Sequence, residues 1–350
     1  MQIINSKLEC GDIAKNAMGG TEIMARRVAS LNPELLKEFQ IIVSRVEEEL
    51  DPTKIRILYC HDLPGDPAND HLKDGGHEKF HKLVFVSNWQ MQRYIDFYQI
   101  PWSKCIVLQN AIEPIPFDKR KWWGIDEQGN DAPAKPDKIK IIYTPTPHRG
   151  LELLVPVFDK LLEKHDNLEL DVFSSFDLYG WTERNKQFQP LFDHCISHEK
   201  INYHGSKPNE VVREALKEAH IFAYPATWPE TSCLCLMEAM SAGCICVHSN
   251  YGALPETAAN WTSQYHFNED KQEHAKIFYT VLMNTIEDVN NQQNLNNQLM
   301  TVKSYTDIFY SWDPNRRVQW EALLMILINQ VKDRAIQAPS GKMFNYNTGG

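Results

Sequence analysis

The chain has 350 residues, 43% hydrophobic and 23% charged, with a net charge of −10 at pH 7. This length favours two folding units, and the composition is that of a water-soluble globular protein. The negative charge disfavours nucleic acid as a partner, because sequence-independent binding needs a positive surface. The start (MQIINSKLEC) lacks a signal-peptide pattern and ALLMILI (322–328) is too short to span a membrane, so we expect a soluble, cytoplasmic protein.

The eight cysteines follow no zinc-binding pattern. Cys233/Cys235 and Cys244/Cys246 are C-x-C pairs, and no C-x-x-C pair occurs. Cys244 and Cys246 fall in an apolar run, where free cysteines behave as small hydrophobic residues. We therefore expect buried, reduced thiols and no metal site.

The first part of the chain alternates between helical and strand patterns. Residues 21–31 carry apolar side chains at helical spacing, directly after the pair Gly19-Gly20. Short runs rich in Ile, Leu and Val then follow, as in buried parallel strands. The predicted strands are 41–43, 55–60, 82–87 and 105–110, with a helix at 88–98. Alternating strands and helices indicate an α/β lobe.

Residues 113–137 interrupt this pattern. They are dense in Pro, Gly and charged residues, which is typical of a linker or an excursion between lobes. The KRKWW segment (119–123) mixes basic and aromatic side chains. A solvated linker explains this segment better than a membrane-surface patch, although peripheral membrane contact stays open.

The remaining chain again alternates strands with helices. The predicted strands are 138–145, 168–174, 201–205, 221–226 and 244–250, and the predicted helices are 151–164, 209–219 and 233–242. The loop after 221–226 lies where open α/β sheets bind ligands. Further on, 284–298 is interpreted as polar helix surface or loop. Asp313 and Pro314 are placed as N-cap and first residue of a helix at 314–332.

These patterns predict two lobes with a connection and a C-terminal extension. The expected parts are an N-terminal lobe at 1–112, a linker at 113–137, a C-terminal lobe at 138–311, a helix at 312–333 and a loose tail at 334–350.

The strongest candidate site is PETSCLCLMEAMSAG (229–243). Glu238 lies among apolar residues of a predicted helix, where a carboxylate is costly unless something hydrogen-bonds it. Two adjacent ribose hydroxyls suit that carboxylate, and Glu230 could accept a bond from a sugar hydroxyl. The first-turn amides near Thr231, Ser232 and Cys233 favour phosphate. The alternative is a helix-capping glutamate and a surface glutamate.

This segment resembles the E-x7-E signature of retaining glycosyltransferases of the GT-B fold, family 4. The resemblance extends to HG at 204–205 and GALPE at 252–256, and covers the second lobe best. It implies an α/β protein with two Rossmann-like lobes facing a central cleft, and a C-terminal helix that packs back across the lobes.

The resemblance also implies a role for each matching residue. Glu230 contacts the donor sugar, and Glu238 binds the nucleotide ribose. Arg149, taken as an exposed cation, grips the diphosphate, and Thr144 stands where the family usually has an arginine. His148 is either a further phosphate ligand or an exposed loop histidine, the latter favoured. The other expected donor-site residues are His61 facing the sugar, Gly19 and Gly20 approaching phosphate, and Ser206 and Lys207 near the base.

The implied reaction is transfer from a nucleotide sugar, such as a UDP- or GDP-sugar, to a glycan, lipid or small-molecule acceptor. It needs neither metal nor cofactor, with Glu230, His61 and Arg149 as the catalytic residues. The alternatives are a sugar-nucleotide 2-epimerase, a phosphorylase, for which no convincing pyridoxal lysine is seen, and a non-catalytic binding protein. An NAD-dependent oxidoreductase is disfavoured, because no G-x-G-x-x-G follows a strand.

Overall fold

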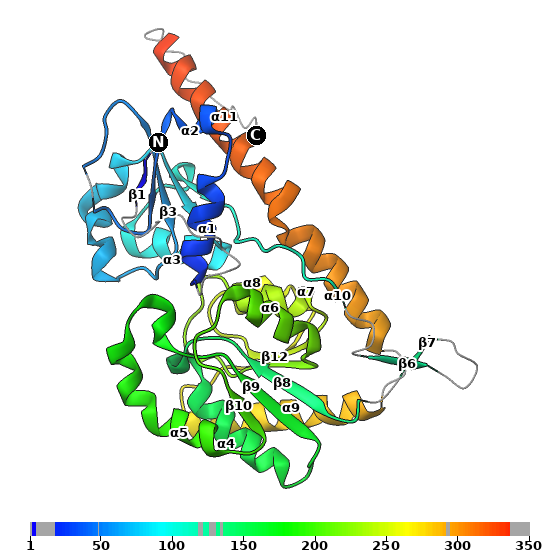
Figure 1. Cartoon of the computed structure of the whole chain (residues 1–350). Coiled ribbons are helices and arrows are strands. Elements are labelled where there is room, and N and C mark those ends of the chain that lie inside the picture. Colours follow the sequence, from blue (N-terminus) through cyan, green and yellow to red (C-terminus); the bar gives the residue numbers. More distant parts are fainter. Residues whose placement is uncertain are drawn as a thin grey trace, which may run out of the picture.

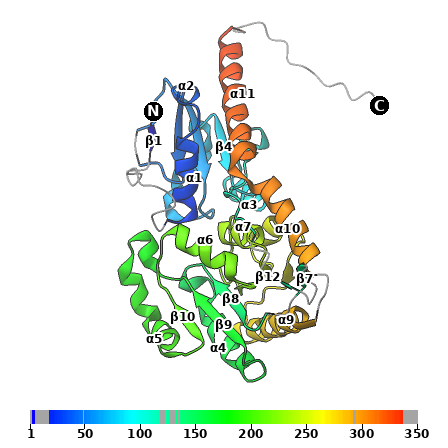
Figure 2. The same cartoon turned by 45° about the vertical axis from the view of Figure 1, so that its right-hand side comes forward.

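The computed structural model describes residues 2–4, 18–47, 49–117, 122–125, 131–133, 136–291 and 295–336. The chain forms two α/β lobes, the first drawn blue to cyan and the second green to yellow (Figure 1). The last two helices, in orange and red, run from the second lobe back along the first (Figures 1 and 2). Residues 337–350 of the expected tail lie outside the described residues.

The first lobe is built on a parallel sheet whose five strands lie side by side in chain order. Helix α1 (Gly20–Ala29) covers one face of this sheet, and α3 (Asn88–Tyr98) covers the other. The strands are β1 (Gln2–Ile4), β2 (Phe39–Val43), β3 (Ile55–Cys60), β4 (Lys82–Phe85) and β5 (Cys105–Val107). Strands β2 to β4 are almost completely buried, which explains why their sequences read as continuous apolar runs.

The second lobe has a six-stranded parallel sheet with the order β10-β9-β8-β11-β12-β13. Its strands are β8 (Ile139–Tyr143), β9 (Leu168–Val172), β10 (Ile201–Tyr203), β11 (Ile221–Tyr224), β12 (Ile245–Ser249) and β13 (Ser263–Tyr265). The chain builds outward from β8 in one direction and then, from β11, in the other. The carboxyl ends of β8 and β11 therefore form a topological switch point, the place where doubly wound sheets bind ligands.

Short helices follow the strands of the second lobe and long ones complete it. The α-helices after the first lobe are α4 (Leu151–Leu162), α5 (Gln189–Ser197), α6 (Asn209–Glu218), α7 (Leu234–Ser241), α8 (Leu254–Ala258), α9 (Lys271–Asn291), α10 (Leu295–Tyr310) and α11 (Arg317–Ile336). The remaining short elements include α2 (Pro33–Leu36) and the 3-10 segments η2 (Pro67–Lys79), η3 (Trp102–Lys104), η5 (Pro147–Arg149), η6 (Phe176–Tyr179) and η7 (Thr182–Phe188).

Two details of the sequence interpretation are corrected. Helix α11 begins at Arg317, after a π-helical turn at Trp312–Arg316 in which Asp313 is non-helical, so Asp313 does not cap it. Instead Asp313 accepts hydrogen bonds from the Arg317 side chain. In the KRKWW segment, Trp122 is buried and donates to the Gly243 carbonyl at 3.2 Å, so its ring cannot enter a membrane surface. Residues 119–121 lie outside the described residues.

The expected connection at 113–137 contains a small hairpin of its own. Strands β6 (Trp123–Ile125) and β7 (Asp131–Pro133) pair antiparallel. None of the helices described in the structure is long and apolar enough to cross a bilayer.

Helix α11 packs on the first lobe, although it follows the second in the chain. Trp320, Leu323, Leu324 and Leu327 are buried in the core formed by α1, β2 and β3. Their spacing places them on one helical face. Trp320 meets the Tyr59 ring edge-on, with 4.9 Å between ring centroids.

A carboxylate of the second lobe accepts hydrogen bonds from the N-terminus of a helix in the first lobe. Glu256, in α8, accepts hydrogen bonds from the backbone N–H groups of Asn88 and Trp89 at 2.9 and 3.0 Å. These are the first two residues of α3, whose N-terminus carries partial positive charge. The side-chain amides of Asn88 and Gln109 donate to the same carboxylate at 2.9 and 3.2 Å. Glu256 therefore links the lobes through hydrogen bonds to both of its carboxylate oxygens.

We expect Glu256→Ala to loosen this link. Loss of charge-assisted hydrogen bonds at a helix N-terminus costs about 1.5–3 kcal/mol. Urea unfolding should show the loss, and small-angle X-ray scattering should show a larger radius of gyration. The exposed Glu210→Ala, on α6, is the control. A variant that unfolds and scatters like the parent protein contradicts the role of Glu256.

Candidate active site

The partly buried Arg149 and the buried Glu230 form an ion pair at the switch point. Arg149 ends a turn (Pro147–Arg149) after β8, and Glu230 lies in the loop between β11 and α7. Arg149 Nη1 lies 2.7 and 2.9 Å from the two carboxylate oxygens of Glu230. Tyr224, at the end of β11, donates its hydroxyl hydrogen bond to Glu230 Oε1 at 2.5 Å. The side chains of Arg149 and Glu230 are 26% and 5% exposed.

The expectation that Arg149 is an exposed cation is therefore wrong. The two loops approach so closely that a Cβ on Gly150 would lie 2.2 Å from the Pro225 carbonyl oxygen. Gly150 also has a φ of +135°, which only glycine adopts without strain. Burial alone lowers the pKa of Arg149, but the neighbouring Glu230 raises it, so the guanidinium stays charged. Its sequence neighbourhood gave no sign of the buried partner.

His61, from the first lobe, also lies at this site. It follows β3, and its backbone carbonyl accepts a hydrogen bond from Thr231 Oγ1 at 2.9 Å, across the two lobes. Burial lowers the pKa of His61 to about 3, so the ring is neutral at pH 7. Its Nε2 atom has no hydrogen-bond partner within the described residues. The neutral His61 ring can therefore form a hydrogen bond with a ligand, but it cannot provide a positive charge.

Gly19 and Gly20 let the first lobe come close to the second. A Cβ on Gly19 would lie 2.4 Å from the Tyr179 ring, and one on Gly20 would lie 3.2 Å from Leu234. Helix α1 starts at Gly20 and has no side-chain cap, so its first amides remain available to an anion. The structure thus adds close contact with the second lobe to the expected role of these glycines.

Buried polar atoms without partners gather at this boundary between the lobes. They come from the loop after β8, the loop after β11, the end of β3 and the first turn of α1. Within the described residues they are Glu22 Oε2, His61 Nε2, Thr144 Oγ1, Thr146 Oγ1, His148 Nδ1, Arg149 Nε and Ser232 Oγ. Native proteins leave few buried polar atoms unpaired. This concentration indicates a place where a polar ligand binds.

Glu238 occupies a different corner of the site, on α7. Arg213 Nη1, from α6, donates to Glu238 Oε1 at 3.3 Å and to the Glu113 carbonyl at 3.0 Å, and Arg213 Nη2 donates to the Pro114 carbonyl at 3.2 Å. Burial raises the pKa of Glu238, and Arg213 and Arg27 act against that rise. The carboxylate is thus tied to the segment that leaves the first lobe. Sequence reasoning missed Arg213.

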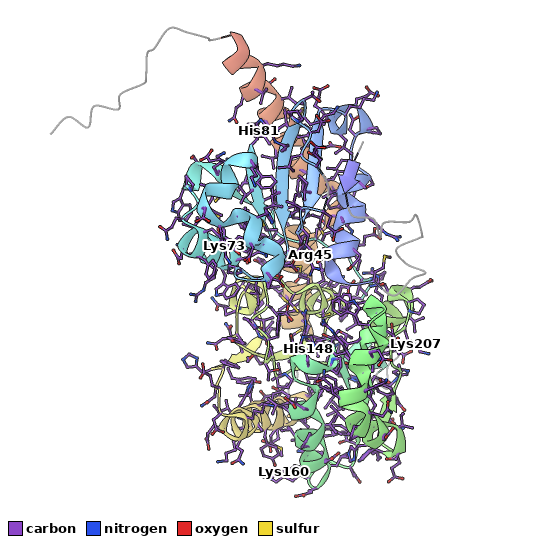
Figure 3. All side chains as sticks on the ribbon, turned by 90° about the vertical axis from the view of Figure 1, so that its left-hand side faces the viewer. Arg45, Lys73, His81, His148, Lys160 and Lys207 are labelled. Carbon is purple, nitrogen blue, oxygen red and sulfur yellow. The ribbon has the colours of Figure 1, made fainter. Side chains whose placement is uncertain are left out.

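The other expected donor-site residues lie along the same edge of the second sheet. Ser206 and the exposed Lys207 follow β10, beside Asn209, whose side chain accepts from the Met18 N–H of the first lobe at 3.0 Å. Figure 3 shows Lys207 at the end of the second lobe that faces the first, whereas Lys160 lies at the opposite end. Ser232 and the buried Cys233 directly precede α7, where Cys233 provides no side-chain cap.

His148 is neither an exposed loop histidine nor a cation. Its ring stacks on Phe176 and meets Trp228 edge-on, each with 5.2 Å between centroids. Burial, followed by the charge of Arg149, lowers the pKa of His148 to about 4. The favoured interpretation of an exposed side chain is therefore corrected, because two aromatic rings enclose it.

Sequence reasoning also missed Tyr224, Tyr179 and Glu256 as parts of this region. Tyr224 could have been found from its place at the carboxyl end of the strand before Glu230. Glu256 belongs to the GALPE segment, but nothing in that segment points to a helix in the other lobe. In the described part of the chain, no cluster of three or more His, Cys, Asp or Glu side chains could hold a metal ion.

A separate cavity of about 330 Å³ lies in the first lobe, lined by residues that include Arg56, Glu78, His81 and Lys104. Figure 3 places His81 far from His148. Lys104 pairs with Glu78 at 2.9 Å. This cavity is not part of the site at the switch point.

Comparison with known proteins gives the family of the second lobe. The model of the family described as glycosyl transferases group 1 matches residues 125–298. No curated protein sequence matches the chain.

Solved structures share the fold over most of the chain. A glycosyltransferase from Rickettsia africae has a TM-score of 0.60 at 16% identity, covering 93% of this chain and 85% of its own. The pneumococcal O-GlcNAc transferase GtfA, in complex with UDP and GlcNAc, has a TM-score of 0.59 at 11% identity. The match covers 89% of this chain and 60% of the GtfA chain. Anabaena HepE, in complex with UDP-glucose, has a TM-score of 0.56 at 12% identity. The match covers 88% of this chain and 82% of the HepE chain. The chain therefore has the two-lobed GT-B fold, and its residues 125–298 belong to the glycosyl transferases group 1 family.

Proposed function

We propose that the chain transfers a sugar from a UDP- or GDP-sugar to a glycan, lipid or small-molecule acceptor, with retention at the anomeric carbon and without a metal ion. The observation that carries this proposal is the group of unpaired buried polar atoms around Arg149 and Glu230. A nucleotide sugar both donates and accepts hydrogen bonds, so it can satisfy them. The nucleotide and sugar ligands of the GtfA and HepE structures support this class of donor.

The proposed donor complex assigns one part of the nucleotide sugar to each group. Arg149 and the amides at Ser232 and Cys233 face the diphosphate, while Glu238 accepts from the ribose hydroxyls. His61 and Glu230 hydrogen-bond the transferred sugar. The base packs near Ser206 and Lys207, and Thr144 donates its hydroxyl hydrogen bond to phosphate.

In the proposed reaction the bond between the sugar C1 and the diphosphate oxygen breaks. A bond from C1 to the acceptor oxygen forms on the same face of the sugar, and the acceptor proton passes to the leaving diphosphate. Charge that builds on the diphosphate meets a guanidinium and backbone dipoles that are already in place. Preorganised hydrogen-bond donors of this kind can take the place of a metal ion.

We expect UDP or GDP to stabilise the protein, also in the presence of EDTA. At a ligand concentration of about 100 Kd, the free energy of unfolding rises by about 2.7 kcal/mol. The melting midpoint should rise by roughly 2–4 °C per kcal/mol. Differential scanning fluorimetry over the common nucleoside diphosphates and their sugars measures this shift. Mass spectrometry of the bound donor then separates transfer or slow hydrolysis from mere binding.

Flat melting curves with every nucleotide contradict a donor site. A shift that EDTA abolishes and Mn²⁺ restores contradicts the metal-free mechanism. Epimerised but uncleaved donor favours the epimerase alternative instead.

A further inference from the structure

Tyr179 lies where the two lobes meet, although the mechanism above does not use it. It ends the turn η6 (Phe176–Tyr179), which follows β9 in the second lobe. A Cβ on Gly19, in the first lobe, would lie 2.4 Å from Tyr179 Cε1 and 3.0 Å from its hydroxyl oxygen. The ring therefore rests directly on the glycine turn that begins α1, and any larger residue at position 19 would displace it.

The Tyr179 hydroxyl faces charged groups of the proposed donor site. Burial raises the pKa of Tyr179 to about 12, and the charges of Arg149, Glu22 and Glu230 also act on it. The phenol is thus protonated at neutral pH and can donate a hydrogen bond. Within the described residues, the Tyr179 hydroxyl forms no hydrogen bond.

The charges at the site do not by themselves satisfy a diphosphate, so a further hydrogen-bond donor is needed. Arg149 Nη1 is engaged by both oxygens of Glu230, so the pair is neutral as a whole. A diphosphate carries several negative charges and needs further hydrogen-bond donors. Among the residues that the structure describes, the buried Arg149 Nε and Ser232 Oγ atoms have no partners, and no side chain caps the first amides of α1. Tyr179 contacts Gly19 at the start of α1, and the charge of Arg149 acts on its hydroxyl, so the phenol can join these donors.

We propose that Tyr179 is a donor-binding residue, whose hydroxyl donates a hydrogen bond to the diphosphate while its ring holds the second lobe against Gly19. This rests on the proposed function. The diphosphate is then held mainly by neutral donors from both lobes, and it binds best when the lobes are together. A nucleoside, which lacks the phosphates, does not use this contact.

Tyr179→Phe tests the hydroxyl, because it keeps the ring that packs on Gly19. Calorimetric titration with UDP and GDP, and with uridine and guanosine, measures the affinities. A lost hydrogen bond to a charged group should weaken diphosphate binding about tenfold or more. Nucleoside affinity and the ligand-free melting midpoint should not change. Tyr279→Phe, on α9, is the matched control and should leave all affinities unchanged.

Equal diphosphate affinity in Tyr179→Phe and the parent protein overturns the role of Tyr179 while leaving the proposed function intact. Equal losses for diphosphate and nucleoside also overturn it, since the hydroxyl would then act on the base or on folding. If the parent protein binds neither UDP nor GDP, the proposed function fails, and this inference with it.

Discussion

Arg149→Met is expected to destabilise the ligand-free protein by about 3 kcal/mol, because it leaves the buried Glu230 carboxylate without its cation. The Tyr224 hydroxyl still donates to that carboxylate, which keeps the loss from being larger. Chemical denaturation with urea measures the change. The variant should also lose the stabilisation that a nucleoside diphosphate gives the parent protein.

The exposed pair Lys271–Glu152 is the control for this prediction. Its ion pair has the same 2.7 Å separation, with side chains 66% and 41% exposed, so Lys271→Met should cost less than about 1 kcal/mol. The double variant Arg149→Met/Glu230→Gln should recover part of the loss, since neither charge is then left alone. An Arg149→Met protein as stable as its parent would mean that the pair contributes nothing to folding.

Glu230→Gln is expected to lower kcat by about ten- to hundredfold, the loss of one charge-assisted hydrogen bond to the transition state. It should not weaken binding of free UDP or GDP, because Arg149 then keeps its full positive charge for the phosphates. Steady-state kinetics with the identified donor, together with calorimetric titration of the diphosphate, separates the two effects.

Glu238→Gln is the counterpart, with the opposite pattern. It should weaken diphosphate affinity by a similar factor and change kcat little, because a ribose is bound alike in the ground and transition states. Equal effects of the two substitutions on diphosphate binding would contradict this division between the glutamates.

Hydrophobic pattern was sufficient to locate most elements of the second lobe. The run at 221–226 contains β11 (Ile221–Tyr224), and the helix expected at 233–242 contains α7 (Leu234–Ser241). Such strands are buried on both faces, so their composition alone distinguishes them from loops. The loop between them, with Glu230, was therefore placed at the correct end of the sheet.

The hydrophobic pattern could not show which contacts form between distant parts of the chain. Arg149 and Glu230 are 81 residues apart, and Glu256 reaches a helix 168 residues away. Which residues pair over such distances depends on how the lobes pack. No local hydrophobic periodicity in the sequence encodes that packing. The segment with Tyr179 has aromatic residues at irregular spacing and forms short 3-10 turns, for which periodicity gives no signal.

Helix α11 has a consequence for how this protein is made. Trp320 and Leu324 are fully buried in the core of the first lobe, beside Met24 and Ile57. During translation, the strands of that lobe leave the ribosome long before this helix does. The part of this sheet face that α1 does not cover therefore stays exposed while the entire second lobe is synthesised, and such a surface is where chaperones bind and aggregation begins. The lobe that is made first can be the last to complete its folding.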